Sequence, residues 1–348
     1  MKQRSLAAVS KGVLKIVDID IPSYGEYEML VRNEGCIFCN TTDKMIVDEL
    51  FDTPDYPTLL GHENFGIVQA IGEKVKNFKV GDRVICANPI PKGYDGKYYS
   101  TWGGFSEYGI AGDLDAYLED YGTLDEANKY KEKWIEQCII PRDFSYKKAG
   151  LVYPMSECAS AIMQVGDLKD KRVVVIGTGI VGYTFVFCAK QMGAKEVICM
   201  GRRQSRLDVA TKLGADNTFI EIRDVVEHLS DYGGADVVFE CSGNYKVFEK
   251  GLPYLKDGGV LACYAVPHKP YEIDLLKFPT NYTYKRIDPQ IRNSIKWVCS
   301  ILAEDKVPVD TFVTHIWDFD QAIDGYNAVI RGEVIKGLVV IAPEGTVE

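Results

Sequence analysis

Three residues in the first quarter of the chain have side chains that could together bind a metal ion: Cys39, His62 and Glu63. Thiolate, imidazole and carboxylate are each good zinc ligands, and a catalytic zinc site has three protein ligands and one exchangeable position. Zinc in such a site can act as a Lewis acid on a substrate oxygen. The pattern therefore predicts a catalytic zinc site. The alternative for His62 is a hydrogen-bonded histidine of the core.

A second group of residues predicts a nucleotide site. Residues 173–176 are all β-branched, which is typical of a strand buried on both faces, and Gly177, Gly179 and Gly182 follow with the spacing G-x-G-x-x-G. The first glycine permits a tight turn, the second lets a pyrophosphate approach the backbone, and the third lets the next helix pack closely. A ligand-free glycine turn is the alternative, but the strand and helix pattern continues downstream and favours a dinucleotide. The residues expected to contact it here are Gly177, Thr178, Gly179, Ile180 and Val181.

The residue after the second strand of this half indicates which cofactor is used. NAD-specific domains carry Asp or Glu there for the ribose 2′-hydroxyl, whereas this chain has Gly201 after strand 196–200. Arg202, Arg203 and Arg206 follow, and guanidinium groups can bind the oxygens of a 2′-phosphate. The sequence therefore predicts NADP. The alternative is that the arginines form a solvated turn and that NAD is accepted as well.

Two kinds of element must position these groups. Residues 1–35 contain short alternating strands typical of an antiparallel β-rich domain. From residue 172 to 265, buried strands alternate with helices, which indicates a doubly wound parallel sheet. Helices are expected at 146–170 and 291–304, on either side of this half.

Composition excludes several classes of function. The chain has 348 residues and a formal net charge of −10, so general attraction to nucleic acid or to an anionic membrane is unfavourable. No apolar run reaches membrane-spanning length, and the N-terminus does not lead into a signal-peptide core. Ten cysteines are scattered along the chain without an export signal. We therefore expect a cytoplasmic protein with a small-molecule substrate and no nucleic-acid or membrane partner.

The order of motifs resembles the zinc-dependent medium-chain dehydrogenase/reductase superfamily over nearly the whole chain. The resemblance implies an α/β protein with a GroES-like β-rich catalytic domain, residues 1–155 and 292–348, and a doubly wound Rossmann domain, residues 156–291. The motifs that carry the resemblance are Gly61-His62-Glu63, the Gly-Ile-Val at 66–68, the segments 80–84 and 103–108, and the glycine fingerprint.

The resemblance also implies a ligand set for the metal. In this family the Cys of the first motif and the His of Gly-His-Glu bind zinc, so Cys39 and His62 are expected as ligands. The adjacent Glu63 is expected to bind the metal or to lie beside it. A third ligand comes from the segment that enters the nucleotide domain. Glu157 is our choice there, and Cys158 is the alternative.

Further roles follow from the same resemblance. A Ser or Thr just after the first Cys relays the alcohol proton. We choose Thr41 over Thr42, while hydrogen bonding to the loop backbone is the alternative for both. Lys336, just before the last strand, is expected to meet the cofactor pyrophosphate, and a solvated lysine is the alternative. Cys241 and Ala265 complete the expected cofactor contacts.

Two segments depart from the family pattern. Many members have four closely spaced cysteines that bind a structural zinc, but here only Cys86 and Cys138 lie between residues 80 and 150. We therefore expect one catalytic zinc and no structural zinc. Asp113 to Gln137 is an acidic insertion with apolar residues at helical spacing, expected to form a solvated helical hairpin rather than a lid or an oligomer contact.

These features together predict a zinc-dependent alcohol or polyol dehydrogenase. Its substrate is expected to be a secondary alcohol or ketone derived from a polyol or sugar, and the aromatic segment 89–102 could stack on a sugar face. The alternatives are a simple alcohol/aldehyde reductase and a non-catalytic nucleotide-binding protein with the same fold. The resemblance further implies a homodimer or homotetramer joined through the nucleotide domains.

Overall fold

A computed structural model describes residues 1–50, 56–85, 97–100, 103–125, 131, 134–243, 252–265 and 281–342. The chain forms two compact units: a first unit of residues 1–154 and 295–348, and a second unit of residues 155–294. Cys86 and most of the aromatic segment 89–102 lie outside the described residues. Among the described helices, none is long and apolar enough to cross a membrane.

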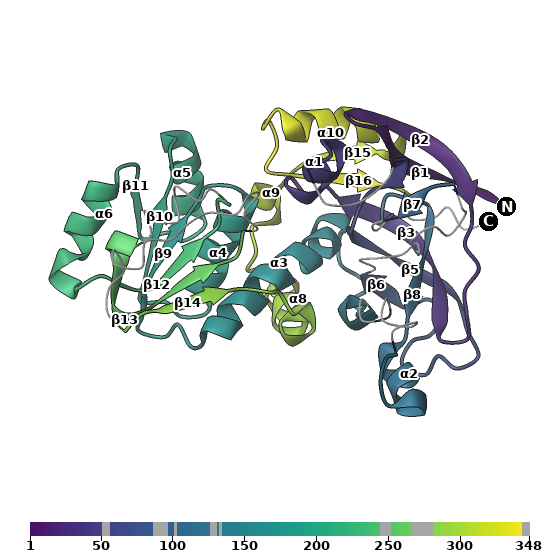
Figure 1. Ribbon diagram of the computed structural model, residues 1–348, viewed down its shortest axis with the longest axis horizontal. Coiled ribbons are helices and arrows are strands. Elements are labelled where there is room, and N and C mark those ends of the chain that lie inside the picture. The colour runs from purple at the N-terminus through teal and green to yellow at the C-terminus, as the bar shows by residue number, and fades with distance from the viewer. Residues whose placement is uncertain are drawn as a thin grey trace. The chain divides into compact units, whose positions relative to one another are not determined.

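The first unit is rich in β-structure and contains two sheets (Figure 1). One sheet has the order β2-β1-β4-β7, and the other has the order β15-β16-β3-β5-β6, with β8 also paired to β3. The bounds of these strands are β1 Lys2–Ser10, β2 Val13–Asp20, β3 Glu28–Ile37, β4 Thr58–Leu59, β5 Glu63–Ile71, β6 Arg83–Ile85, β7 Tyr99–Ser100, β8 Tyr108–Gly112, β15 Val313–Asp318 and β16 Lys336–Val340. β16 therefore lies inside its sheet, between β15 and β3.

A hydrophobic core packs β1, β3 and β16 against two helices, α1 (Thr42–Val47) and α10 (Ala322–Ile330). Phe38 is near its centre: its ring lies 4.6 Å from that of Phe105 and 6.1 Å from that of Tyr326. Because Phe38 directly follows β3 and precedes Cys39, this packing fixes the start of the loop that carries the predicted metal ligand.

The second unit is a six-stranded sheet with the order β11-β10-β9-β12-β13-β14 and parallel pairing throughout (Figure 1). Its strands are β9 Arg172–Ile176, β10 Glu196–Met200, β11 Asn217–Phe219, β12 Ala235–Glu240, β13 Leu255–Cys263 and β14 Thr283–Arg286. β9 lies between β10 and β12, so the strand order reverses at the glycine fingerprint. Ligands of doubly wound sheets bind at such a switch point.

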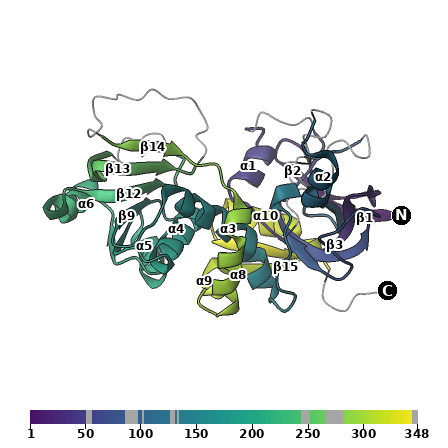
Figure 2. The ribbon, with the colours of Figure 1, turned by 90° about the horizontal axis from the view of Figure 1, so that it is seen from below.

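Helices cover both faces of this sheet, as the buried strand pattern predicts. Figure 2 shows α4 (Ile180–Gln191) and α5 (Gln204–Lys212) along one face, where Phe185 of α4 lies 4.6 Å from Phe239 of β12. The neighbouring Val238 points to the opposite face and packs in a cluster with Val225 of α6 (Ile222–Leu229). The predicted α/β fold, a β-rich domain combined with a doubly wound domain, is confirmed.

The two helices expected before and after the nucleotide-binding strands are shorter than expected. α3 spans Tyr146–Val165 instead of reaching residue 170, and α8 spans Ile295–Ala303 after a single 3₁₀ turn at Ile291–Asn293. A further short helix, α9, spans Val309–Phe312.

The described part of the acidic insertion contains one helix, α2 (Leu114–Tyr121), and a helical turn at 134–136. Asp113 caps α2 by accepting a hydrogen bond from the amide of Ala116. Tyr117 and Trp134 are buried against Tyr27 near the start of β3, so the insertion has its own small aromatic core. Residues 126–130 and 132–133, which complete the expected hairpin, lie outside the described residues.

Candidate active site

The pairing of β3 with β5 brings the predicted metal ligands together. Ile37, the last residue of β3, is paired with Glu63, the first residue of β5, so the loop after β3 faces the start of β5. Cys39 lies in that loop, and His62 directly precedes Glu63. Gly61 has a φ of +98°, and a Cβ there would lie 2.6 Å from the Phe105 ring, which explains why glycine precedes His62.

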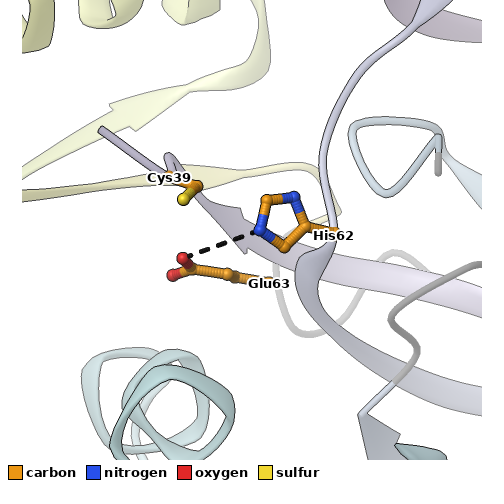
Figure 3. Close-up of side chains that lie close together, drawn as sticks. All are labelled: Cys39, His62 and Glu63. Carbon is orange, nitrogen blue, oxygen red and sulfur yellow. Dashed lines mark ion pairs between the residues drawn. The ribbon is translucent and has the colours of Figure 1, made fainter. Parts of the chain in front are cut away.

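Figure 3 shows the side chains of Cys39, His62 and Glu63 pointing toward one another. A sulfur, a ring nitrogen and a carboxylate oxygen from the three residues all lie within 4.8 Å of one another. His62 Nε2 is 4.0 Å from Glu63 Oε1, and the two side chains are only 9% and 2% exposed. The arrangement is a converging set of nitrogen, sulfur and oxygen donors in which His62 and Glu63 are buried and Cys39 is half-buried. Such a set matches the ligand preference of zinc.

The electrostatic surroundings of His62 favour a cation. Burial by itself lowers its pKa, but a hydrogen bond with Cys39 and the negative charges of Cys39, Asp43 and Glu63 together raise the pKa of His62 to about 10. A divalent cation among these groups would take the place of the proton that they stabilise. The donor set therefore fits zinc in charge as well as in chemistry.

Asp43, which the sequence analysis did not single out, lies beside Cys39 and His62. Its carboxylate is 1% exposed, Oδ2 accepts a hydrogen bond from the Cys39 amide at 2.9 Å, and Oδ1 lies 4.0 Å from His62 Nδ1. Burial is the main reason that the pKa of Asp43 rises to about 6. A carboxylate on the far nitrogen of a metal-binding histidine orients the ring and selects its tautomer. An acid four residues after Cys39, at the start of a short helix, is the signal that could have found it.

Lys336 has a partner that the sequence analysis did not foresee. Its Nζ donates to both carboxylate oxygens of Glu63, at 2.8 and 2.6 Å, and to the carbonyl of Phe38 at 2.9 Å. The alternative of a solvated lysine is wrong, because the Lys336 side chain is 2% exposed. Burial lowers its pKa, but the charges of Glu63, Cys39 and Asp43 and the hydrogen bonding to Glu63 together outweigh this, so the pKa is raised. An ammonium group has three protons, and these three acceptors match them. The expected contact with pyrophosphate stays a prediction.

The residues predicted to relay the proton and those predicted to supply the third metal ligand belong to different units. Thr41 is exposed at the start of α1 and does not cap the helix with its side chain, whereas Thr42 is half-buried. Glu157 is half-buried in α3 and accepts a hydrogen bond from the Tyr264 hydroxyl at 3.4 Å, and Cys158 is 2% exposed. Glu157 and Cys158 belong to the second unit, so the identity of the third ligand stays a prediction.

The glycine fingerprint has the geometry of a pyrophosphate cradle. Gly177 follows β9 with a φ of +129°, and a Cβ on Gly182 would lie 2.0 Å from the Gly177 carbonyl, so both positions require glycine. Gly179 caps α4, and a Cβ there would meet no atom within 4 Å. The N-terminus of α4, where Ile180 and Val181 begin the first turn, thus has open space in front of it. The residues present fit a dinucleotide.

The other expected cofactor residues lie at the same edge of the sheet. Cys241 follows β12, and its amide bonds to the carbonyl of Ile176 at 3.1 Å. Ala265 lies just beyond β13. Glu240, which the sequence analysis missed, is 3% exposed. Its carboxylate accepts a hydrogen bond from the amide of Ser242 at 2.7 Å and so holds the loop after β12 in place.

The residues proposed to contact the 2′-phosphate of NADP follow the end of β10. Gly201 is buried directly after that strand, while Arg202 and Arg203 are exposed at the start of α5. Arg206 is half-buried, and its Nη1 donates to the carbonyl of Thr178 at 3.0 Å. Arg206 therefore links α5 to the fingerprint loop.

Comparison with known proteins agrees with both units. Residues 25–119 match the family model of the alcohol dehydrogenase GroES-like domain, and residues 181–297 match that of zinc-binding dehydrogenases. An L-threonine 3-dehydrogenase of Symbiobacterium thermophilum is 29% identical over 74% of this chain and 73% of its own length. The D-xylulose reductase of Saccharomyces cerevisiae is 24% identical over 93% of each chain. The crystal structure of a zinc-binding dehydrogenase from Sinorhizobium meliloti bound to NADP has a TM-score of 0.77 at 22% identity, and covers 98% of this chain and 100% of its own.

Proposed function

Since the chain belongs to the zinc-dependent medium-chain dehydrogenase/reductase superfamily, we propose that it exchanges a hydride between NADP and a secondary alcohol or ketone at one catalytic zinc. The observation that carries this proposal is the convergence of half-buried Cys39 with buried His62 and Glu63, whose donor atoms lie within 4.8 Å of one another. A non-catalytic nucleotide-binding protein would have no need to keep a thiolate, an imidazole and two carboxylates, Asp43 and Glu63, in one buried place.

The residues around the metal have distinct tasks. Cys39 and His62 would hold zinc, with Glu157 as the proposed third ligand and Cys158 as the alternative. Asp43 accepts a hydrogen bond from the Cys39 amide, and its other oxygen, 4.0 Å from His62 Nδ1, would orient the His62 ring once zinc is bound. Bound zinc supplies Lewis acidity to the substrate oxygen, which makes proton loss easier.

Glu63 is better suited to lie beside the metal than to bind it. Both of its oxygens are hydrogen-bonded to Lys336, and neither side chain is more than 2% exposed. To become a ligand, Glu63 would have to give up at least part of a buried ion pair. The proposed role of Glu63 is therefore to provide negative charge next to zinc, with Lys336 holding its carboxylate in place.

The alcohol proton needs a path to water. Thr41 is exposed two residues after Cys39, so its hydroxyl can pass a proton from the site to solvent, and Thr42 is the alternative. If Thr41 is the relay, Thr41→Val should reduce kcat while leaving the zinc content unchanged.

The proposed substrate is a small polar molecule with a secondary hydroxyl, such as a sugar alcohol or the corresponding ketone. The relatives named for D-xylulose and for L-threonine support this choice, because both of those molecules are small and polar. A simple alcohol or aldehyde reductase is the second candidate. A panel of polyols, simple alcohols and ketones, assayed with both nicotinamide cofactors, separates the two: kcat/KM should be highest for a polyol or its ketone.

NADP is the proposed cofactor because the position after β10 is glycine and three arginines follow. NAD is the alternative, and the ratio of kcat/KM values for the two cofactors decides between them.

We further propose a homodimer or homotetramer in the cytoplasm, and sizing chromatography that finds a monomer would contradict that assembly.

A further inference from the structure

We propose that Thr178 locks position 201 as glycine and thereby keeps an acidic side chain away from the cofactor ribose. This inference rests on the proposed use of NADP and assigns a specificity-determining pair, Thr178 and Gly201, to that site. The observation is steric: a Cβ built on Gly201 would lie 2.4 Å from Thr178 Cγ2 and 2.9 Å from its Oγ1. Real Cβ atoms essentially never approach other heavy atoms within 3.0 Å.

Rotation of the Thr178 side chain cannot remove this overlap. Two of the three staggered positions around its Cα–Cβ bond are too close to the site of the new Cβ. Threonine fills two of the three positions in every rotamer, so at least one γ atom always occupies a blocked position. Valine would do the same, whereas serine can place its single γ atom in the third position and alanine has none.

The backbone on both sides of the contact is anchored. The Thr178 carbonyl accepts a hydrogen bond from Arg206 Nη1 at 3.0 Å, and the Arg206 carbonyl accepts one from the Tyr183 hydroxyl at 3.0 Å. On the other side, the Gly201 amide bonds to the carbonyl of Phe219 at 3.1 Å. The loop and the strand end therefore cannot separate without losing these bonds. The third neighbour of the new Cβ, Leu207 Cδ2 at 3.1 Å, is the end of a flexible side chain.

The lock has a consequence for cofactor choice. An Asp or Glu that bonds the ribose 2′-hydroxyl must stand at the end of the second strand, which is position 201 here. Because such a residue needs a Cβ, it fits only if position 178 is small. Gly201→Asp by itself should therefore disturb the loop instead of converting the protein to NAD.

The first test measures stability without cofactor. Gly201→Ala in the full-length protein should lower Tm by about 2–12 °C, as expected for overpacking in a protein of this size. Adding Thr178→Ala or Thr178→Ser should restore most of the loss, whereas Thr178→Val, the matched control, should restore none. Gly201→Ala with an unchanged Tm, or equal rescue by Thr178→Val, would overturn the lock.

The second test measures cofactor binding through the fluorescence of NADPH and NADH. Gly201→Asp alone should weaken binding of both cofactors, whereas Gly201→Asp with Thr178→Ala should shift the ratio of their Kd values at least about tenfold toward NADH. Tight NADH binding by the single variant would refute the inference. If the unaltered protein prefers NADH, the proposal of NADP fails, and the stability test still decides whether the lock exists.

Discussion

Replacing Lys336 with methionine should show how strongly the candidate metal site depends on the ion pair between Lys336 and Glu63. The substitution keeps an unbranched side chain, one atom shorter, but removes its charge. It leaves the Glu63 carboxylate, which is 2% exposed, without the ammonium that contacts both of its oxygens, and it leaves the Phe38 carbonyl without its donor.

Removing one partner of a buried pair costs about 3–5 kcal/mol, because the remaining charge stays buried without compensation. Because both side chains are 2% exposed, solvent screening does not reduce this value. For a folding unit of this size, the loss corresponds to a Tm lower by about 6–20 °C. Zinc beside Glu63 would supply positive charge in place of the lysine, so the loss should be clearly smaller when zinc is present.

The assay is thermal unfolding of the unaltered protein and of Lys336→Met, each with a chelator and with added zinc. Lys2→Met is the matched control, since the Lys2–Asp20 pair has side chains 63% and 55% exposed and such pairs contribute at most about 1 kcal/mol. The double variant Lys336→Met with Glu63→Gln should recover part of the loss. An unchanged Tm of Lys336→Met in chelator would show that the ion pair does not stabilise the fold, and an equal loss with and without zinc would show that Glu63 does not face the metal.

Four further results are expected. Elemental analysis should find one zinc per chain, and two would contradict the prediction that there is no structural zinc. Cys39→Ala should lose zinc and activity but keep its Kd for NADPH, because the glycine fingerprint belongs to the other unit; normal turnover by this variant would exclude the metal mechanism. Asp43→Asn should weaken zinc binding by about 10–100-fold in a metal-buffer titration, and an unchanged affinity would remove its orienting role. Arg203→Ala should raise the Kd for NADPH and leave that for NADH nearly unchanged; equal effects on both would mean that Arg203 does not contact the 2′-phosphate.

Much of the fold could be predicted because its signals are local. The β-branched run at 173–176 and the glycines after it specify a buried strand, a turn and a helix within eleven residues, and the structure has β9 and α4 there. Two of the candidate metal-binding residues, His62 and Glu63, are adjacent in sequence at the start of β5. Cys39 joins them through one pairing, that of β3 with β5. The metal cluster needed no more than this single long-range contact.

The partner of Lys336 could not be predicted in the same way. Its local context, Ile335-Lys-Gly-Leu, is equally compatible with a solvated strand start and with a cofactor contact, because neither burial nor the neighbouring strand can be read from it. Two pairings decide the outcome: β16 lies between β15 and β3, and β3 in turn pairs with β5. Together they place the first residue of β16 over the first residue of β5, 273 positions away. The Thr178–Gly201 contact has the same origin, since the parallel pairing of β9 with β10 brings the residues that follow each strand together. In both cases, local sequence specifies the chemical groups, and strand order specifies which of them meet.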